Sequence, residues 1–439
     1  MSGDKLPAID PLLTKARRYR WLVFGVLALG YVLVYFHRLC PAVVAVDMMR
    51  DLAASGVLVG LLGSAYFYPY AAMQLPAGLL SDSWGPRRTV TAFFLVAVVG
   101  SVLLAMAPSV GWAIFGRVLV GLGVSMLFVP TMKVLAEWFH PTEFATMAGI
   151  LMAMGGLGSL AAAMPLAALA AWVGWRASFG LVGAATLVLA VLVWVLVRDR
   201  PADLGWPSPA VAAGKDPGDK PPPIRLGEGV RRVLADGSFW VLAVWFFFEC
   251  AVFFTFGGLW GGPYLMQVHG MTRQQAGQIL SMFAVGMVVG SPTVSLASNR
   301  LFRARKPVII LCTALTLAIT IALTLFVDSL SVPALYAVCL GLGLFSSSVV
   351  VVGFTVAKEL FPVQMAGTAT GLVNLFPFAG GAVFQPVLGS VLERYGQVDG
   401  RFTVAGYRAA FLVLAGCAAM ALVASALLKE TFDRGAEAR

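Results

Sequence analysis

The chain has 439 residues, of which 59% are hydrophobic and only 12% are charged. A soluble domain has about 25% charged residues, so this chain cannot cover a water-exposed surface of ordinary composition. We therefore expect the lipid bilayer to be the solvent for most of the chain. The formal net charge of +10 does not indicate nucleic-acid binding, because the basic residues lie in short loops between apolar segments.

The sequence carries no signature of a cofactor, a metal site or an enzyme. The cysteines lie in or beside apolar segments, without close pairs or neighbouring histidines, at positions Cys40, Cys250, Cys312, Cys339 and Cys417. No GxxxxGK[ST] nucleotide-binding motif occurs, which argues against an ATP-driven pump. No nucleophile triad is evident either, so we expect no enzymatic activity.

Twelve apolar segments are long enough to cross a membrane as helices, since one span needs about 20 apolar residues. We expect them near residues 21–46, 54–80, 89–107, 111–138, 143–172, 177–197, 238–268, 274–298, 307–327, 330–357, 364–392 and 404–428. The sequence thus predicts an all-α membrane protein. An even number of spans places both termini on the same side of the membrane.

The basic residues predict which side that is. Most of the 31 Lys and Arg residues fall in the N-terminal tail, the central stretch and the loops after the second and eighth spans. Such residues are enriched in cytoplasmic loops. We therefore expect an integral membrane protein, in the inner membrane if the source is bacterial, with both termini in the cytoplasm.

The central stretch 199–236 differs from its surroundings, because it contains the segments RPADLGWPSP and KDPGDKPPP. Proline, glycine and charge at this density predict a cytosolic linker. It divides the chain into an N-terminal six-helix bundle, residues 1–198, and a C-terminal six-helix bundle, residues 237–439. One chain of this kind is sufficient for a transport pathway, so we expect a monomer.

The two predicted bundles repeat one another in sequence. GLGVSMLFVPTMKVLAEWFHP from Gly121 matches GLGLFSSSVVVVGFTVAKELFP from Gly341, and WRASF at Trp175 matches YRAAF at Tyr407. Parallel six-helix repeats are one known transporter architecture, with the substrate site between the halves near the membrane midplane. The repeat therefore predicts a transporter.

The loop after the second span, Gly78–Arg88, reads GLLSDSWGPRR. It resembles the signature loop of the major facilitator superfamily, although Ser83 and Pro86 replace basic residues of that pattern. The resemblance extends over essentially the whole chain and implies two six-helix bundles that rock about a central site. It assigns a gating group that comprises Gly78, Asp82, Gly85, Arg87, Arg88 and Glu137.

The same resemblance suggests what the loop residues do. Gly78 is expected to let a neighbouring helix approach closely, and Gly85 to permit a tight turn. In the family the loop aspartate acts on the inner gate against the other half. We expect Asp82 to face the positive N-terminus of the eleventh span, near Pro362.

Arg117 in the fourth span begins the segment RVLVGLG, which resembles a second motif of the superfamily. The family links this arginine to structure or to proton coupling. Because Arg117 lies near one end of its span, it can also snorkel or cap a neighbouring loop. Both interpretations remain open.

Arg38 is the most informative charge in the sequence. It lies about eighteen residues beyond Trp21, near the midplane at about 1.5 Å per residue. A buried ionisable residue is a functional candidate, and Arg38 needs an anion, either substrate or a carboxylate of another helix. The segment Tyr35-Phe-His37-Arg38 resembles the organic-anion and sugar-phosphate branches of the superfamily. His37 is either a proton carrier or a hydrogen-bonded packing residue.

Further polar groups extend the predicted site. Lys133 is either a second anion contact or the partner of Glu137, one turn along the same helix. Tyr35 and Asn374 are expected to line the cavity. In the eleventh span, Gly380–Gly381 mark an expected bend.

Glu249 is the one acid deep in the second half. An apolar setting favours the protonated form of a carboxyl group, which suits proton uptake and release. Glu249 is alternatively the charge partner of Arg38. The two roles are compatible, because a proton can switch such a pair on and off.

The sequence therefore predicts a secondary active transporter that moves a small organic anion, a carboxylate or a phosphorylated metabolite, by alternating access with proton coupling. The predicted substrate contacts are Arg38, Tyr35, Lys133 and Asn374, and the predicted coupling residues are Glu249, His37 and Arg117. The alternative is a proton-driven exporter of drugs or siderophore-like compounds. Drug antiporters carry a Gly-Pro motif in the fifth span, which the segment Gly149–Gly158 lacks.

Overall fold

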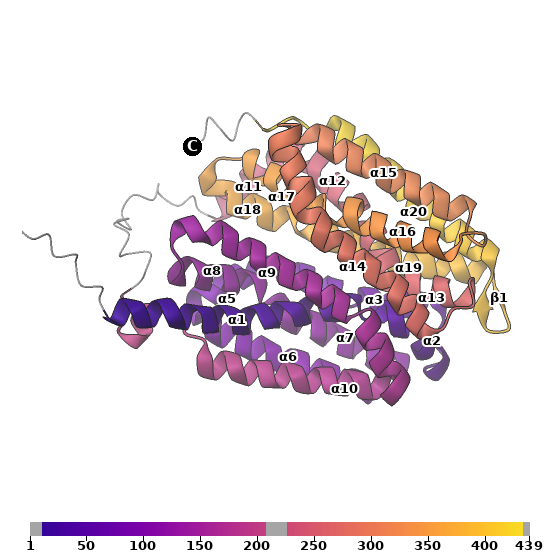
Figure 1. Cartoon of the computed structure of the whole chain (residues 1–439), viewed down its shortest axis with the longest axis horizontal. Helices are drawn as coiled ribbons and strands as arrows, with labels where there is room; N and C mark the ends of the chain where they lie inside the picture. The colour runs from indigo at the N-terminus through magenta and orange to yellow at the C-terminus, as the bar shows by residue number, and fades with distance from the viewer. Residues whose placement is uncertain (1–10, 208–225, 433–439) are drawn as a thin grey trace, which may run out of the picture.

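The computed structural model describes residues 11–207 and 226–432, and this part of the chain is almost entirely helical (Figure 1). Part of the predicted linker, residues 208–225, lies outside the described residues. One antiparallel hairpin pairs β1 (Gln397–Val398) with β2 (Arg401–Phe402). We call the end of the molecule where α1 begins and α20 ends the termini end, and the opposite end the hairpin end.

The first part of the chain forms ten helices. Their bounds are α1 (Pro11–Leu39), α2 (Pro41–Asp51), α3 (Gly56–Ser64), α4 (Phe67–Ala72), α5 (Gln74–Trp84), α6 (Pro86–Ala105), α7 (Val110–Ser125), α8 (Phe128–Trp138), α9 (Pro141–Ala161) and α10 (Met164–Leu196). A short helix, η1 (Pro201–Leu204), follows at the start of the predicted linker.

The described second part contains three π-helical segments, of which η3 and η5 lie inside spans and η4 ends one. The bounds are α11 (Leu226–Ala235), α12 (Gly237–Val252), η3 (Phe253–Trp260), α13 (Gly261–Gln267), α14 (Arg273–Leu296), η4 (Ala297–Leu301), α15 (Lys306–Leu325), α16 (Val332–Leu342), η5 (Gly343–Ser347), α17 (Val350–Glu359), α18 (Val363–Val373), α19 (Leu375–Arg394) and α20 (Val404–Leu427). In Figure 1, α1 to α10 occupy one side of the molecule and α12 to α20 the other.

Ten helical segments of the described chain are long and apolar enough to cross a bilayer, and the bent pair Gly56–Ala72 with Pro76–Trp84 is an eleventh. One of the ten, Thr146–Leu196, has 51 residues. At about 1.5 Å per residue it is more than twice as long as the hydrocarbon layer of about 30 Å. Its backbone leaves helical geometry at Gly174, where φ is +79°. We count it as two spans, which gives the twelve that the sequence predicts.

Two spans are broken at prolines. Pro76 and Pro377 lack the N–H groups that would bond to the carbonyls of Ala72 and Val373, four residues earlier. Helices α4 and α18 end at those two residues. The helix is not interrupted at Gly380–Gly381, because α19 continues through both glycines.

Small residues let the two parts of the chain touch backbone to backbone at the hairpin end. A Cβ atom on Gly262 of α13 would lie 1.6 Å from the carbonyl oxygen of Ala42 in α2. A Cβ on Gly389 of α19 would lie 2.2 Å from the carbonyl oxygen of Gly56 in α3. No side chain fits at either contact, so this end of the molecule is closed in the structure.

This closure is tested by Gly262→Ala, with Gly416→Ala as the control because a Cβ on Gly416 meets nothing within 4 Å. Alanine is favoured over glycine inside a helix by about 0.5–1 kcal/mol. We expect Gly416→Ala to keep or raise the melting temperature of the purified protein, and Gly262→Ala to lower it and to expose the buried Cys40, between α1 and α2, to thiol reagents. Equal melting temperatures would contradict the packing described here.

Candidate functional site

The Arg38 side chain is surrounded by aromatic rings from both parts of the chain. Its guanidinium carbon lies 4.4 Å from the ring centre of Tyr35, 5.0 Å from those of Tyr70 and Phe378, and 5.7 Å from that of Phe254. These rings come from α1, α4, α19 and η3. We call the four rings the aromatic cage. Arg38 is only 5% exposed.

No carboxylate reaches Arg38 in the described part of the chain, where its side chain forms no ion pair and its Nε has no hydrogen-bond partner. The side chains of Tyr66 and Tyr70 lie close enough to the guanidinium to interact with it electrostatically. Ring faces and hydroxyl groups stabilise a cation without neutralising it. The cage therefore holds a buried positive charge that can still accept an anion.

Glu249 lies apart from this cage, on α12, and is completely buried. The hydroxyl of Thr316 donates to its Oε1 at 3.0 Å, and its Oε2 has no partner among the described residues. The hydroxyl of Ser346, in η5, donates to the backbone carbonyl of Glu249 at 3.3 Å. The ion pair with Arg38, one of the two alternatives above, is not formed in this structure. Glu249 precedes the cage residue Phe254 by five residues on the continuous helix formed by α12 and η3.

Arg117 joins three helices through backbone carbonyl groups. Its Nη1 donates to the His37 carbonyl at 2.7 Å and its Nε to the Leu62 carbonyl at 3.4 Å. Its guanidinium carbon lies 5.2 Å from the Tyr66 ring centre, and its Nη2 has no partner among the described residues. Both ring nitrogens of His37 are likewise buried without a partner. These contacts favour the structural interpretation of Arg117, and its coupling role and that of His37 stay predictions.

Lys133 lies at the termini end, away from the aromatic cage. Its Nζ is 2.7 Å from Oδ1 of Asp82 and donates to the Ser81 carbonyl at 3.0 Å. The pair links α8 to α5, so Lys133 bonds neither an anion in the cage nor Glu137, and Asp82 is paired within its own half. Because Asp82 is 74% exposed, this pair contributes at most about 1 kcal/mol to stability. Glu137 is half-buried on α8.

The two glycines of the signature loop behave differently. Gly85 has φ +84°, and a Cβ there would lie 2.2 Å from Oδ2 of Asp199, so the tight turn is present. A Cβ on Gly78 would meet nothing within 4 Å. The close helix approach expected at Gly78 is therefore wrong for the described part of the chain, in which no neighbouring helix comes within 4 Å of that Cβ position.

The basic residues of the loop also have separate roles. The Arg87 backbone N–H donates to Oδ1 of Asp199 at 2.7 Å, and its Nε donates to the Trp194 carbonyl at 2.7 Å. Arg87 thus attaches the start of α6 to the end of α10. Arg88 is exposed.

One feature that sequence reasoning missed is a carboxylate cap repeated in both halves. Asp199 caps the start of α6, and Glu430 caps the start of α15 by accepting from the N–H groups of Arg305 at 2.8 Å and Lys306 at 3.0 Å. Arg305 also pairs with Glu359 at 2.9 Å. The two acids follow the WRASF and YRAAF segments at nearly the same spacing, so the repeat itself carried the signal.

A second missed feature is the ion pair between Arg273 of α14 and Asp47 of α2 at the hairpin end. Among the described residues it is the one ion pair that joins the two halves. The side chains are 22% and 11% exposed. No short-range sequence signal marks this pair, because its members lie more than two hundred residues apart.

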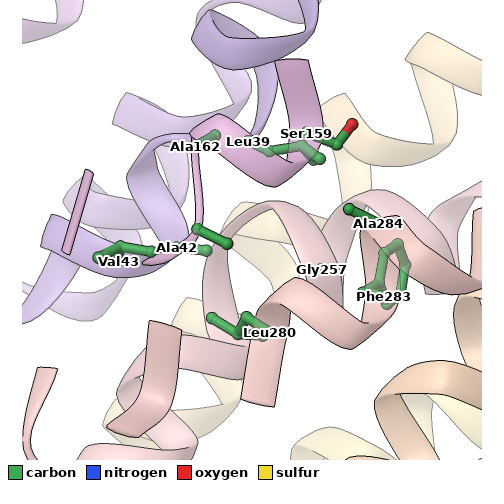
Figure 2. A pocket seen from close by; sticks show the side chains of 10 residues that line it. Leu39, Ala42, Val43, Ser159, Ala162, Gly257, Leu280, Phe283 and Ala284 are labelled. Carbon is green, nitrogen blue, oxygen red and sulfur yellow. The ribbon is translucent and has the colours of Figure 1, made fainter. Parts of the chain in front are cut away.

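A small, mostly apolar pocket lies beside the cage on its hairpin side (Figure 2). Its lining comes from both halves: Leu39, Ala42, Val43, Ser159, Ala162, Ala163, Gly257, Leu280, Phe283 and Ala284. Ser159 supplies the only polar side chain. The pocket shows where the halves meet, but it offers no charge to an anion.

Comparison with known proteins identifies the family. The sequence matches the Major Facilitator Superfamily over residues 27–261 and over residues 247–438. The chain belongs to this superfamily. It is therefore an integral membrane protein of a transporter family and not an enzyme.

Three relatives illustrate the similarity. A probable sulfoacetate transporter of Cupriavidus necator is 24% identical, with 88% of this chain and 90% of that protein aligned. A hexuronate transporter of Bacillus subtilis is 24% identical over 94% of each chain. The crystal structure of a bacterial homologue of the human lysosomal transporter Spinster, inward-facing and unoccupied, covers 96% of this chain and 98% of its own, with a TM-score of 0.75 and 19% identity. The predicted all-α superfamily fold is confirmed.

The two carboxylate caps differ in their expected response to pH. Burial alone would raise the pKa of Glu430, but the N–H groups of Arg305, Phe432 and Lys306 hold it below its ordinary value. Burial raises the pKa of Asp199, although the Arg87 N–H opposes this. A lowered pKa stabilises the fold above the ordinary value, and that contribution is lost as the pH falls. A raised pKa has the opposite effect, because its contribution to stability is gained as the pH falls.

We therefore expect Glu430→Gln to reduce the melting temperature near pH 7, with the deficit relative to wild type shrinking as the pH falls below about 4.5, the ordinary glutamate value. For Asp199→Asn, wild type should gain stability relative to the variant as the pH falls. Thermal unfolding of both variants across about pH 3–8 measures this. The same sign of pH dependence for the two variants would contradict the interpretation.

Proposed function

We propose that this protein is a secondary active transporter that moves a small organic anion, a carboxylate or a phosphorylated metabolite, by alternating access. The observation that carries the proposal is the buried guanidinium of Arg38, which no carboxylate neutralises in the described chain and which rings from both halves surround. The names of two relatives specify sulfoacetate and hexuronate, which are organic anions. These names do not favour the alternative of a drug or siderophore exporter.

The cage suits an anion for chemical reasons. A guanidinium offers parallel donors to a carboxylate, sulfonate or phosphate group. The surrounding rings exclude water, and the low local dielectric strengthens the charge interaction. Tyr35 forms part of the cage, and Asn374 lies one helical turn from Phe378. We keep Arg38, Tyr35 and Asn374 as substrate contacts, whereas Lys133 belongs to the ion pair with Asp82.

Alternating access requires each end of the molecule to open in turn. The hairpin end is closed here by the Asp47–Arg273 pair and by the Gly262 and Gly389 contacts. With the termini in the cytoplasm, as the loop charges predict, this closed end faces away from the cytoplasm. The likeness to an inward-facing relative supports that orientation. Both halves lie in one chain, so a monomer is sufficient.

Glu249 is our proposed proton-coupling group. Its Oε2 is buried without a partner in the described chain, so the uncharged form is less costly than the ionised form. Helix α12, which carries Glu249, continues directly into η3, which supplies Phe254 to the cage. A change of protonation can therefore be transmitted to the anion site through a short π-helical segment, a structure often found at functional sites. His37 and Arg117, in the other half, are proposed to influence how protonation of Glu249 affects anion binding at Arg38.

The anion site predicts a specific loss in Arg38→Gln. Because a hydrogen bond to a charged group contributes about 1.5–3 kcal/mol, we expect the Kd of a hexuronate to rise about 10- to 100-fold. Lys133→Gln is the matched control and should change the Kd less than about threefold. Isothermal titration of the purified variants measures both. A Kd that depends on Lys133 and not on Arg38 would refute the assignment.

The coupling role of Glu249 predicts a separation of two transport modes. In proteoliposomes, Glu249→Gln should lose accumulation of a hexuronate driven by a proton gradient but retain exchange between internal and external anion, because the glutamine mimics the protonated carboxyl group. Glu228→Gln, on the exposed surface of α11, should leave both modes unchanged. Undiminished proton-driven accumulation by Glu249→Gln would remove this residue from the mechanism.

A further inference from the structure

The breaks in two spans are joined to each other by a side-chain hydrogen bond. Asn374 separates α18 from α19, and Gln74 begins α5 immediately after the break that ends α4. The Asn374 Nδ2 donates to Gln74 Oε1 at 3.0 Å. Gln74 is only 7% exposed. Two proline-broken helices from opposite halves thus meet at one amide pair.

This amide pair lies directly beneath the aromatic cage. The Gln74 Nε2 donates to the carbonyl of Tyr70 at 3.0 Å, and the ring centres of Tyr70 and Phe378 are 4.5 Å apart. Gln74 follows Tyr70, and Asn374 precedes Phe378, by four residues each. Because the two spans run in opposite directions, both amides lie about one turn, about 5.4 Å, from the cage rings toward the termini end.

The hairpin side of the same two spans is held more firmly. The Tyr68 hydroxyl donates to the Ala382 carbonyl at 2.9 Å, and the Val57 N–H donates to Glu393 at 2.9 Å. The glycine contact between α3 and α19 adds a backbone-to-backbone surface. Toward the termini end, in contrast, the side-chain hydrogen bond that joins these spans in the described chain is the Gln74–Asn374 bond. Release in that direction requires this bond to break.

We propose that the Gln74–Asn374 pair is the gate beneath the cage and that it selects which anions are carried. An anion held by Arg38 opens the gate when it carries a second hydrogen-bonding group, a hydroxyl or a second acid, about one helical turn from its charged end. That group replaces the amide–amide bond. An anion without such a group binds but leaves the gate closed. This inference rests on the proposed anion site at Arg38.

The energetic reason is that buried amides are costly to leave without partners. Breaking the pair without replacement leaves a donor and an acceptor unsatisfied, at about 1–3 kcal/mol for each group. A substrate hydroxyl offers both a donor and an acceptor, so it removes this cost. Transport rate, rather than affinity, therefore depends on the second polar group.

The test compares a hexuronate with propionate, which has a carboxylate but no hydroxyl, at saturating concentrations in proteoliposomes. We expect wild type to carry the hexuronate at least about tenfold faster, corresponding to about 1.4 kcal/mol in the barrier. In Gln74→Leu and Asn374→Leu the ratio of the two rates should fall toward about one. Gln397→Leu, at an exposed glutamine of β1, should keep the wild-type ratio.

Two further variants keep the outcomes distinct. The swapped double variant Gln74→Asn with Asn374→Gln retains an amide pair and should retain the ratio. A wild-type ratio in both leucine variants, or loss of the ratio in the swapped variant, would overturn the gate. Arg38→Gln should weaken binding of both anions. If Arg38→Gln binds both anions as tightly as wild type, the proposed anion site is refuted. If Arg38→Gln weakens binding but the leucine variants keep the wild-type rate ratio, only the gate is refuted.

Discussion

The structure depends on one electrostatic constraint: a guanidinium held in the membrane interior without a carboxylate beside it. Removing a charge from water costs several kcal/mol even after relaxation, so such a group requires compensation. Arg38 obtains part of it from four ring faces and from tyrosine hydroxyls. An anion can supply the rest of this compensation. Because α1 and α4 of one half and η3 and α19 of the other supply the rings, the proposed anion site lies where the halves meet.

This arrangement connects binding to the opening of the molecule. Separation of the halves at the level of the cage removes rings from Arg38 and changes what stabilises its charge. The hairpin end is closed by glycine contacts and by the Asp47–Arg273 pair, whereas one amide pair lies beneath the cage toward the termini end. Between the α3–α5 and α18–α19 spans, the described contacts are therefore more numerous toward the hairpin end than toward the termini end. A carrier that releases its cargo at the termini end needs this asymmetry.

The sequence was sufficient for the fold, and it indicated Arg38, the residue at the centre of the proposed site. The superfamily is predicted by span length, the internal repeat and the loop Gly78–Arg88. Few architectures are possible in a membrane, because every backbone polar group there needs a hydrogen-bond partner within the protein. Arg38 was found because a charge at membrane depth is rare. Its neutral neighbours Tyr70, Phe254 and Phe378 were not, since aromatic residues are common in every span and only the tertiary structure shows which of them converge.

The incorrect predictions have a common cause, which is that they concerned contacts between distant segments. Lys133 was expected to contact the anion or Glu137, but its Nζ pairs with Asp82. Gly78 was expected at a helix contact, but a Cβ there would meet nothing within 4 Å. Sequence spacing reports which residues share a helix face, not which helix lies opposite. The eleventh span is broken at Asn374, four residues before Phe378, because of Pro377. A bend had been expected later in the span, at Gly380–Gly381. The domain boundaries within residues 199–236 stay a prediction.

The most direct test of the central claim is a structure of the protein with a hexuronate bound, determined by electron cryo-microscopy in lipid nanodiscs. The account predicts that the carboxylate of the ligand lies about 3 Å from the guanidinium nitrogens of Arg38, within the cage formed by Tyr35, Tyr70, Phe254 and Phe378. A ligand bound elsewhere, or a bound state in which Arg38 pairs with Glu249 and not with the anion, would contradict it.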